Sequence, residues 1–235
     1  MKTEIKLVAH GGFSAKFPEN TEQSFLEAVK FNPQIIEMDI IEHPQTGELI
    51  CFHPSGISSE AGTFTKEMVF EQLLQGEAFP SVTEILEKIP RNIKILLDFK
   101  QPSKELFEKV INSSEIDLTR VIIGVRNLSD FEFIHSINSD VQTLALFSDP
   151  DSFVEYAQEG GKYFRLWEKD LTEERVRAIQ NLGLEVWVTP GHKATESQPR
   201  TAGEVDVEKL DWLAGLMVNA ILVNDIEFTS NYLQK

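Results

Sequence analysis

Two acidic residues in an otherwise apolar segment are the first sign of chemistry in this sequence. Glu37 and Asp39 lie within 35–41, a run of Ile and Met that is typical of a buried strand. Residues two apart in a strand point to the same face, and burying two carboxylates together is costly without a compensating charge. Carboxylate oxygens are the ligands that Mg2+ and Ca2+ prefer. The pair therefore predicts a divalent-cation site, with a solvated or salt-bridged strand face as the alternative.

A third carboxylate repeats this arrangement later in the chain. Asp98 lies two residues before Lys100 at the end of the apolar segment 93–100. If the carboxyl ends of these strands meet, Asp98 completes a set of three acidic ligands. The alternative is a structural ion pair between Asp98 and Lys100.

Two histidines end apolar segments and are candidates for proton transfer. His10 ends the segment 6–10 and His53 ends the segment 49–53. One such histidine is more often a packing residue, but two beside three carboxylates favour acid–base chemistry near neutral pH. The remaining histidines are weaker candidates: His43 in a turn, His135 within a helix and His192 in a loop.

The segments that must position these residues alternate between strand and helix character. Expected strands cover 6–10, 35–41, 49–53, 93–100, 121–125, 143–147, 163–167, 185–189 and 220–223. Expected helices cover 82–89, 104–112, 149–158, 172–182 and 207–217, with others after Thr21, from Ser129 and at the C-terminus. This order predicts parallel strands with helical crossovers in a closed (β/α)8 barrel, with an open doubly wound sheet as the alternative.

Length and composition fit that fold. The chain has 235 residues, 41% hydrophobic and 26% charged, and a barrel of this kind takes roughly 250 residues. We expect one barrel domain over residues 1–235. A segment rich in Ser, Gly and Glu, residues 54–79, is expected to form a small insertion over one end of it.

The charge balance excludes some classes of partner. The formal net charge is -16, so a nucleic acid or an anionic membrane surface would be repelled. A phosphate-bearing small molecule would need a cation held inside the site. The single cysteine, Cys51, excludes an intramolecular disulfide. Because we recognise neither a signal peptide nor a membrane span, we expect a cytoplasmic protein; the oligomeric state stays open.

Several of these motifs, taken in order, resemble the glycerophosphodiester phosphodiesterases. The matching fragments span nearly the whole chain: His10-Gly11-Gly12, Pro18-Glu19-Asn20-Thr21, Glu37-Met38-Asp39, Phe52-His53, Leu97-Asp98-Phe99-Lys100, Val186-Trp187-Val188-Thr189 and Ala220-Ile221-Leu222-Val223-Asn224-Asp225. The combination of Pro-Glu-Asn-Thr with Glu-x-Asp is specific, although each fragment alone is weak.

The resemblance implies a (β/α)8 barrel that uses one divalent cation, Mg2+ or Ca2+. The implied reaction hydrolyses a glycerophosphodiester to glycerol 3-phosphate and an alcohol, with a cyclic phosphate forming when a substrate hydroxyl attacks first. His53 is expected to be the base and His10 the acid. The other implied roles are these: Glu37, Asp39 and Asp98 as metal ligands, Lys100 at the phosphate, and Glu19 near the cation or substrate.

Three residues depart from the pattern of that family. Gly11 stands where an arginine is usual, Pro54 where an aspartate is usual, and Asp98 where a glutamate is frequent. We expect Arg126, which follows the strand 121–125, to supply the missing positive charge at the phosphate, with Arg165 as a second candidate. The alternative is an exposed loop arginine.

Two alternative functions follow from these departures. The first is a related phosphodiesterase that acts on substrates of the lysophospholipid type. The second is a catalytically impaired barrel that binds phosphodiesters without turnover, because Gly11 and Pro54 replace the usual arginine and aspartate.

Overall fold

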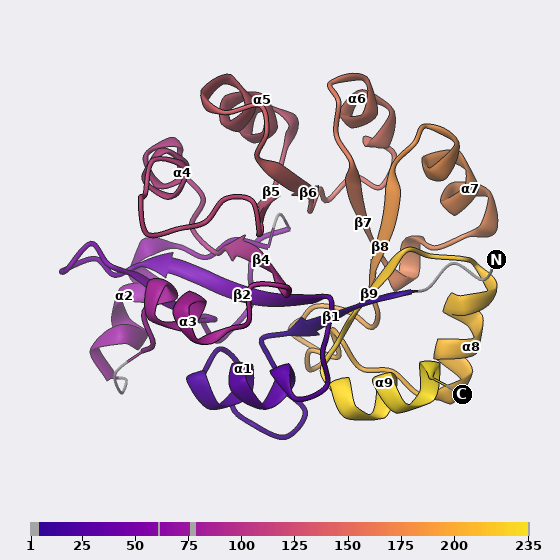
Figure 1. The fold of residues 1–235 in the computed structure, drawn as a ribbon, viewed down its shortest axis with the longest axis horizontal. Coiled ribbons are helices and arrows are strands. Elements are labelled where there is room, and N and C mark those ends of the chain that lie inside the picture. The colour runs from indigo at the N-terminus through magenta and orange to yellow at the C-terminus, as the bar shows by residue number, and fades with distance from the viewer. Residues whose placement is uncertain (1–4, 61, 76–78, 235) are drawn as a thin grey trace.

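Eight parallel strands close into a barrel (Figure 1). The computed structural model describes residues 5–60, 62–75 and 79–234. The barrel strands are β1 (Lys6–His10), β2 (Ile35–Glu42), β4 (Lys94–Phe99), β5 (Val121–Val125), β6 (Gln142–Ala145), β7 (Tyr163–Trp167), β8 (Glu185–Thr189) and β9 (Ala220–Val223). They pair in this order, and β1 pairs with both β9 and β2, which closes the ring. The predicted (β/α)8 barrel is confirmed, and the open sheet is excluded.

Helices surround the strands (Figure 1). They are α1 (Glu22–Val29), α2 (Lys66–Gln75), α3 (Val82–Lys88), α4 (Lys104–Ile111), α5 (Leu128–Ile137), α6 (Phe153–Gln158), α7 (Glu173–Asn181), α8 (Val207–Gly215) and α9 (Ile226–Leu233), with a short 3-10 helix, η1 (Glu168–Asp170). The hydroxyl of Thr21 accepts from the backbone N–H of Ser24 and so caps α1. The preceding residue, Asn20, has a positive φ of 61° and contacts the active site instead.

Side chains alternate along the strands between an outer core, packed against the helices, and the interior of the barrel. The same alternation places polar residues at the barrel mouth. Ile36, Met38 and Ile40 of β2 face the helices and belong to the large outer core. Ile35 faces inward with Trp187 of β8 and other apolar residues that fill the barrel interior. Towards the carboxyl ends of the strands the inward positions become polar. A period of two therefore places an apolar floor beneath a polar mouth.

The structure corrects the expected strand over 49–53. Only Leu49–Cys51 forms a strand, β3, and it runs antiparallel to β2 outside the ring of eight. The reason is the tight turn before it, in which Gly47 has a φ of 72° and its N–H donates to the carbonyl of His43 at 2.8 Å. A connection this short can only return the chain antiparallel.

The expected insertion contains a helix that the sequence reading missed. Residues 61 and 76–78 of the segment 54–79 lie outside the described residues, but α2 covers Lys66–Gln75. Val69 is buried and packs with Phe64, Ile41 and Ile50 in a small third core. This apolar contact supports a helix whose own sequence is only weakly amphipathic.

Two further features concern membrane crossing and the single thiol. Within the described ranges, no helix has both the length and the apolar character that a bilayer span requires. Cys51 is a fully buried free cysteine, and burial, followed by the nearby charges of Asp39 and Glu37, raises the pKa of its thiol far above the usual range. A neutral, enclosed thiol is chemically inert.

The apolar floor makes a testable contribution to stability. Trp187 is 1% exposed, so we expect Trp187→Ala to lower the free energy of unfolding by about 3–5 kcal/mol. Trp212 on α8 is 41% exposed, and Trp212→Ala should change it by no more than about 0.5 kcal/mol. Urea unfolding followed by circular dichroism measures both. Equal losses in the two variants would contradict a packed barrel interior.

Candidate active site

Three carboxylates meet at the mouth of the barrel. Glu37, Asp39 and Asp98 each present a ligand oxygen, and these atoms lie within 4.8 Å of one another. They converge because β2 and β4 are neighbours and Asp39 is directly opposite Asp98 in the parallel register. The predicted convergence of the three residues is therefore present.

Two cations stand between these carboxylates. The ammonium group of Lys100 donates to Oδ2 of Asp98 at 2.8 Å and contacts Oδ1 of Asp39, while Arg126 forms an ion pair with Oδ1 of Asp98. Burial opposes ionisation of both aspartates. The positive charges around Asp39, of which Lys100 is the strongest, together outweigh it there, and Arg126 with Lys100 outweighs it at Asp98, so both pKa values fall below their ordinary range. Lys100 and Arg126 thus both reach the site as the sequence predicted.

Glu37 lacks a comparable cation. Its Oε2 accepts a hydrogen bond of 2.8 Å from the backbone N–H of Gly11, whose φ of 59° is readily available to glycine. Burial, and then the negative charge of Asp39, raise the pKa of Glu37 well above its ordinary value. An additional positive charge placed among the three carboxylates would reverse that shift.

Asn20 holds Asp39 in place. Its amide donates to Oδ2 of Asp39 at 2.7 Å and accepts from the Asp39 backbone N–H at 2.9 Å. The remaining carboxylate oxygen, Oδ1, is buried and has no hydrogen-bond partner among the described residues, although Lys100 contacts it. An oxygen of this kind is available to a metal ion.

His10 is held in one tautomer by its neighbours. Asn224 donates from its amide nitrogen to the carbonyl of Ala202 at 2.9 Å, which turns the amide oxygen towards His10. The Nδ1–H of His10 therefore donates to Oδ1 of Asn224 at 2.8 Å, and Nε2 carries the lone pair. Burial, and then the neighbouring Arg200, lower the pKa of His10 to about 4.

Arg200 is a site residue that the sequence reading missed. It lies in the loop between β8 and α8, and its guanidinium donates to Nε2 of His10 at 2.8 Å and to both carboxylate oxygens of Glu19 at 3.1 and 3.2 Å. An arginine thus stands beside the first histidine although position 11 is glycine. A single arginine in a polar loop has no periodic signal, so only the fold identifies it.

His53, like Arg200, lies close to Glu19. Its Nδ1 is 4.0 Å from Oε1 of Glu19, its ring packs edge-on against Phe64, and it has no hydrogen bond among the described residues. Burial lowers its pKa; the charge of Asp39 opposes this, and that of Lys100 adds to it. Its imidazole is therefore neutral near pH 7 and free to accept a proton.

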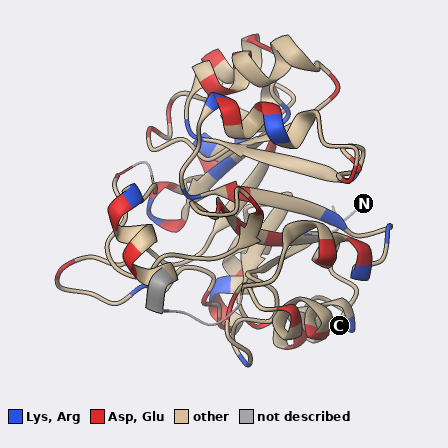
Figure 2. Ribbon diagram, turned by 90° about the vertical axis from the view of Figure 1, so that its left-hand side faces the viewer, with Lys and Arg blue, Asp and Glu red and all other residues tan. Residues whose placement is uncertain are grey.

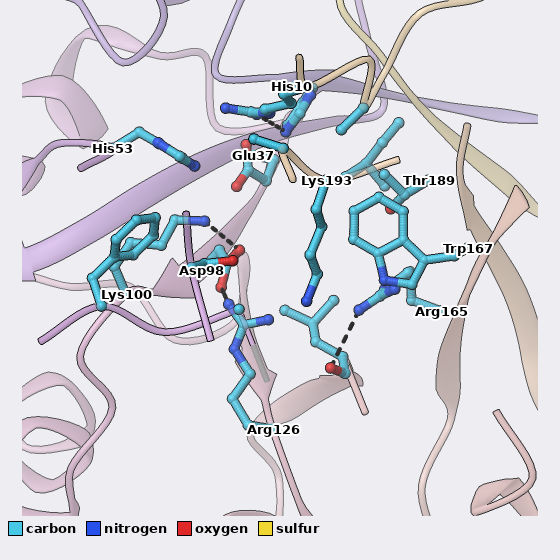
Figure 3. Close-up of a pocket in the computed structure, with 18 of the residues that line it drawn as sticks. His10, Glu37, His53, Asp98, Lys100, Arg126, Arg165, Trp167, Thr189 and Lys193 are labelled. Atoms are coloured by element: carbon cyan, nitrogen blue, oxygen red, sulfur yellow. Dashed lines mark hydrogen bonds and ion pairs between the residues drawn. The ribbon is translucent and has the colours of Figure 1, made fainter. Parts of the chain in front are cut away.

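These groups line a cavity of about 90 Å3 at the barrel mouth (Figure 3). Figure 3 shows His53 and Lys100 on one side of it and Arg165 with Trp167 on the other. Arg165, the second sequence candidate for a phosphate contact, therefore faces the same space as Arg126. The three weaker histidine candidates are absent from the lining that the structure describes: His43, His135 and His192.

Sequence comparison finds relatives of one kind. A Bacillus subtilis (strain 168) protein, YhdW, provisionally named a glycerophosphodiester phosphodiesterase, is 27% identical over 152 residues, 58% of this chain and 56% of that protein. The Bacillus altitudinis glycerophosphodiester phosphodiesterase is 21% identical over 200 residues, 74% of this chain and 81% of that one. No family profile matches the sequence. The aligned region thus spans little more than half of the first relative.

Solved structures share the fold over the whole chain. A protein from Galdieria sulphuraria, provisionally named a glycerophosphodiester phosphodiesterase, has a TM-score of 0.78 at 20% identity and covers 98% of both chains. An Oleispira antarctica phosphodiesterase, solved in complex with the product sn-glycerol-3-phosphate, has a TM-score of 0.70 at 15% identity, covering 98% of this chain and 97% of that one. The chain is similar to the glycerophosphodiester phosphodiesterases in sequence and in fold. The resemblance found in the sequence is thereby confirmed.

Replacing Gly203, which lies in the same loop as Arg200, tests how His10 is positioned in this protein. A Cβ on Gly203 would lie 2.1 Å from Oδ1 of Asn224 and 2.7 Å from Nδ1 of His10. Gly183 has the same φ of 84° with nothing within 4 Å of such a Cβ. We expect both Gly→Ala variants to lose about 1–2 kcal/mol through backbone strain, with a larger loss for Gly203→Ala. Only Gly203→Ala should shift the His10 ring signals in 15N NMR. Unchanged His10 signals would contradict the contact.

The Arg200 contact has a measurable effect on the ionisation of His10. Removing a cation beside an imidazole favours its charged form, so Arg200→Met should raise the pKa of His10 above its value of about 4, without restoring the ordinary value because burial remains. NMR titration of the ring measures this shift. Arg177→Met, which removes an exposed arginine of α7 paired with Glu173, is the control and should leave the pKa of His10 unchanged. Equal titration curves in wild type and Arg200→Met would exclude the contact in solution.

Proposed function

We propose that this protein hydrolyses glycerophosphodiesters to glycerol 3-phosphate and an alcohol, with one divalent cation and two histidines. The observation that carries the proposal is the convergence of three carboxylates beside one small cavity that two neutral imidazoles also line. The names of the two Bacillus relatives and the glycerol 3-phosphate bound to the Oleispira antarctica phosphodiesterase support the same substrate class.

The carboxylate cluster fits a hard divalent cation, Mg2+ or Ca2+. Glu37, Asp39 and Asp98 would hold it, since Oδ1 of Asp39 is buried without a hydrogen bond and Glu37 lacks a cation that would keep it ionised. When bound, such a cation would polarise the phosphate and stabilise negative charge that develops on its oxygens. Lys100 would remain beside the ligands and contact a phosphate oxygen.

The two histidines suit opposite roles in proton transfer. His53 has no hydrogen bond within the described structure and is neutral, so we assign it as the base that removes a proton from the glycerol hydroxyl next to the phosphate. The resulting alkoxide attacks phosphorus, and the bond to the leaving alcohol breaks. His10 would donate the proton to that alcohol. Water would then open the cyclic phosphate with the two roles reversed, which restores both imidazoles.

Arg200 would prepare His10 for its role as the acid. In the structure its guanidinium is in contact with Nε2 of His10. If Arg200 turns towards the substrate phosphate, a cation leaves the imidazole and an anion approaches it, and both changes raise the pKa of His10. Glu19 would orient Arg200, because both of its carboxylate oxygens accept from that guanidinium; its expected contact with the cation or the substrate stays a prediction.

The cavity favours a compact substrate. Its volume of about 90 Å3 is well below the roughly 300–1,000 Å3 of sites that enclose drug-sized ligands. A lysophospholipid would need additional apolar space for its acyl chain. The alternative of a catalytically impaired barrel rests on Gly11 and Pro54, which replace the usual arginine and aspartate. Arg200 beside His10 supplies an arginine close to the position where Gly11 lacks one.

Release of glycerol 3-phosphate from glycerophosphocholine tests the proposed reaction. We expect turnover with Mg2+ or Ca2+, loss of turnover in EDTA, and a fall in kcat of about 100- to 10,000-fold in His10→Ala. His43→Ala is the control, because His43 lies in the turn before β3. Metal binding by calorimetry without turnover on any glycerophosphodiester would favour the impaired barrel. Full activity in EDTA would overturn the metal role.

A further inference from the structure

The cavity has a second side, across the barrel from the carboxylates. In the ring of eight strands β7 is opposite β2, because three strands separate the two in either direction. Arg165 and Trp167 of β7 therefore face Glu37 of β2 across the mouth, and Lys193 extends between the two sides (Figure 3). The proton-transfer steps proposed above use neither Arg165 nor Lys193.

Arg165 is a buried cation that forms no ion pair with any of the described carboxylates. It is 4% exposed, and its one hydrogen bond among the described residues runs from Nη2 to the carbonyl of Leu146 at 3.2 Å. Its other terminal nitrogen, Nη1, is buried and unpartnered within the described structure. Arg120, near the other end of the barrel, shows a structural alternative: its guanidinium donates to three backbone carbonyls within 3.4 Å.

Lys193 adds a second charge at the same place. Its Nζ lies 5.7 Å from the centre of the Trp167 ring, and the guanidinium carbon of Arg165 lies 4.6 Å from the same ring. Apart from the ring, the contact described for Lys193 is the backbone carbonyl of Glu60 at 2.6 Å. Burial, and then repulsion from Arg165 and Arg126, lower the pKa of Lys193 to about 8.

Arg126 completes a cationic cluster, by which we mean Arg126, Arg165 and Lys193. A Cβ placed on Gly62 would lie 3.2 Å from Nη1 of Arg126 and 3.5 Å from Nζ of Lys193, so these two charged groups border the same point. Among the described carboxylates, only Asp98 forms an ion pair with any member of the cluster, and Lys100 shares it.

This accumulation of positive charge calls for an external anion. Unpaired buried charges are destabilising, and within the described structure Asp98 is the one carboxylate paired with these three cations, although the net charge of the protein is -16. In the view of Figure 2 the acidic residues are spread over many helices and loops. Tryptophan stabilises both cations only weakly, because each cation–π contact contributes about 0.5–2 kcal/mol.

We propose that the cationic cluster binds a second phosphate group, carried by the alcohol half of the diester. The inference rests on the proposed function and predicts a preference, among its substrates, for glycerophosphodiesters whose alcohol is itself phosphorylated. Guanidinium groups bind phosphate through paired donors, and three cations suit a dianionic phosphate monoester better than a singly charged carboxylate. With the scissile phosphate at the carboxylates, the leaving alcohol extends across the mouth towards β7.

A matched pair of substrates tests this inference. Glycerophosphoglycerol and glycerophosphoglycerol phosphate differ by one terminal phosphate, and 31P NMR follows loss of either diester. We expect kcat/KM of the wild type to be about tenfold or more higher for the phosphorylated diester. Lys193→Met should reduce this preference by a similar factor. The control is Lys169→Met, since Lys169 is exposed two residues from Trp167 and should leave the preference unchanged.

The outcomes separate this inference from the proposed function. Equal kcat/KM values in the wild type, or a preference that survives in Lys193→Met, would overturn the second phosphate site and leave the hydrolase intact. If neither diester is hydrolysed, the proposed reaction fails, and calorimetry with the same two compounds still tests the site. Tighter binding of the phosphorylated compound, weakened in Lys193→Met and retained in Lys169→Met, supports it. Equal affinities exclude it.

Discussion

Like charges gathered in a low-dielectric space must be compensated, and the mouth of this barrel is organised around that constraint. Three carboxylates reach one point because β2 and β4 are adjacent and in register. Lys100 and Arg126 neutralise two of them. Glu37 has no ion pair among the described residues, and burial followed by the charge of Asp39 raises its pKa. A doubly charged ion placed there would relieve the imbalance, and under the proposed function it would make chemistry on an anionic substrate feasible in an acidic protein.

The polar mouth has two halves that differ in the charged groups that line them. On the side of β1, β2 and β4, carboxylates and imidazoles lie beside cations that partly satisfy them. On the side of β7 the charged side chains are positive. Within the described structure they contact backbone carbonyls and one indole ring. A cation at the carboxylates, together with a ligand that carries separated negative charges, would satisfy both halves at once. The barrel provides this spacing because its two sides are held apart by the packed interior beneath the mouth.

The fold and half of the site could be predicted because both depend on short-range periodicity. The period of two in 35–41 and 93–100 places Glu37, Asp39 and Asp98 on inward faces, and the helix–strand alternation indicates a barrel. The hairpin to β3 and the helix α2 escaped prediction because a tight turn and a small local core decide them. Arg200 escaped because a loop residue acquires its neighbours only when the chain has closed.

The enclosed thiol of Cys51 has a practical consequence for labelling experiments at the barrel mouth. Cys51 is the one cysteine in the sequence, and it is buried and neutral. A cysteine introduced at an exposed position of the Arg200 loop would then react selectively with a maleimide dye or a nitroxide label, and Cys51 would not have to be replaced first. The distance between two such labels, measured by fluorescence transfer or by electron spin resonance, would report whether the barrel mouth opens and closes during turnover.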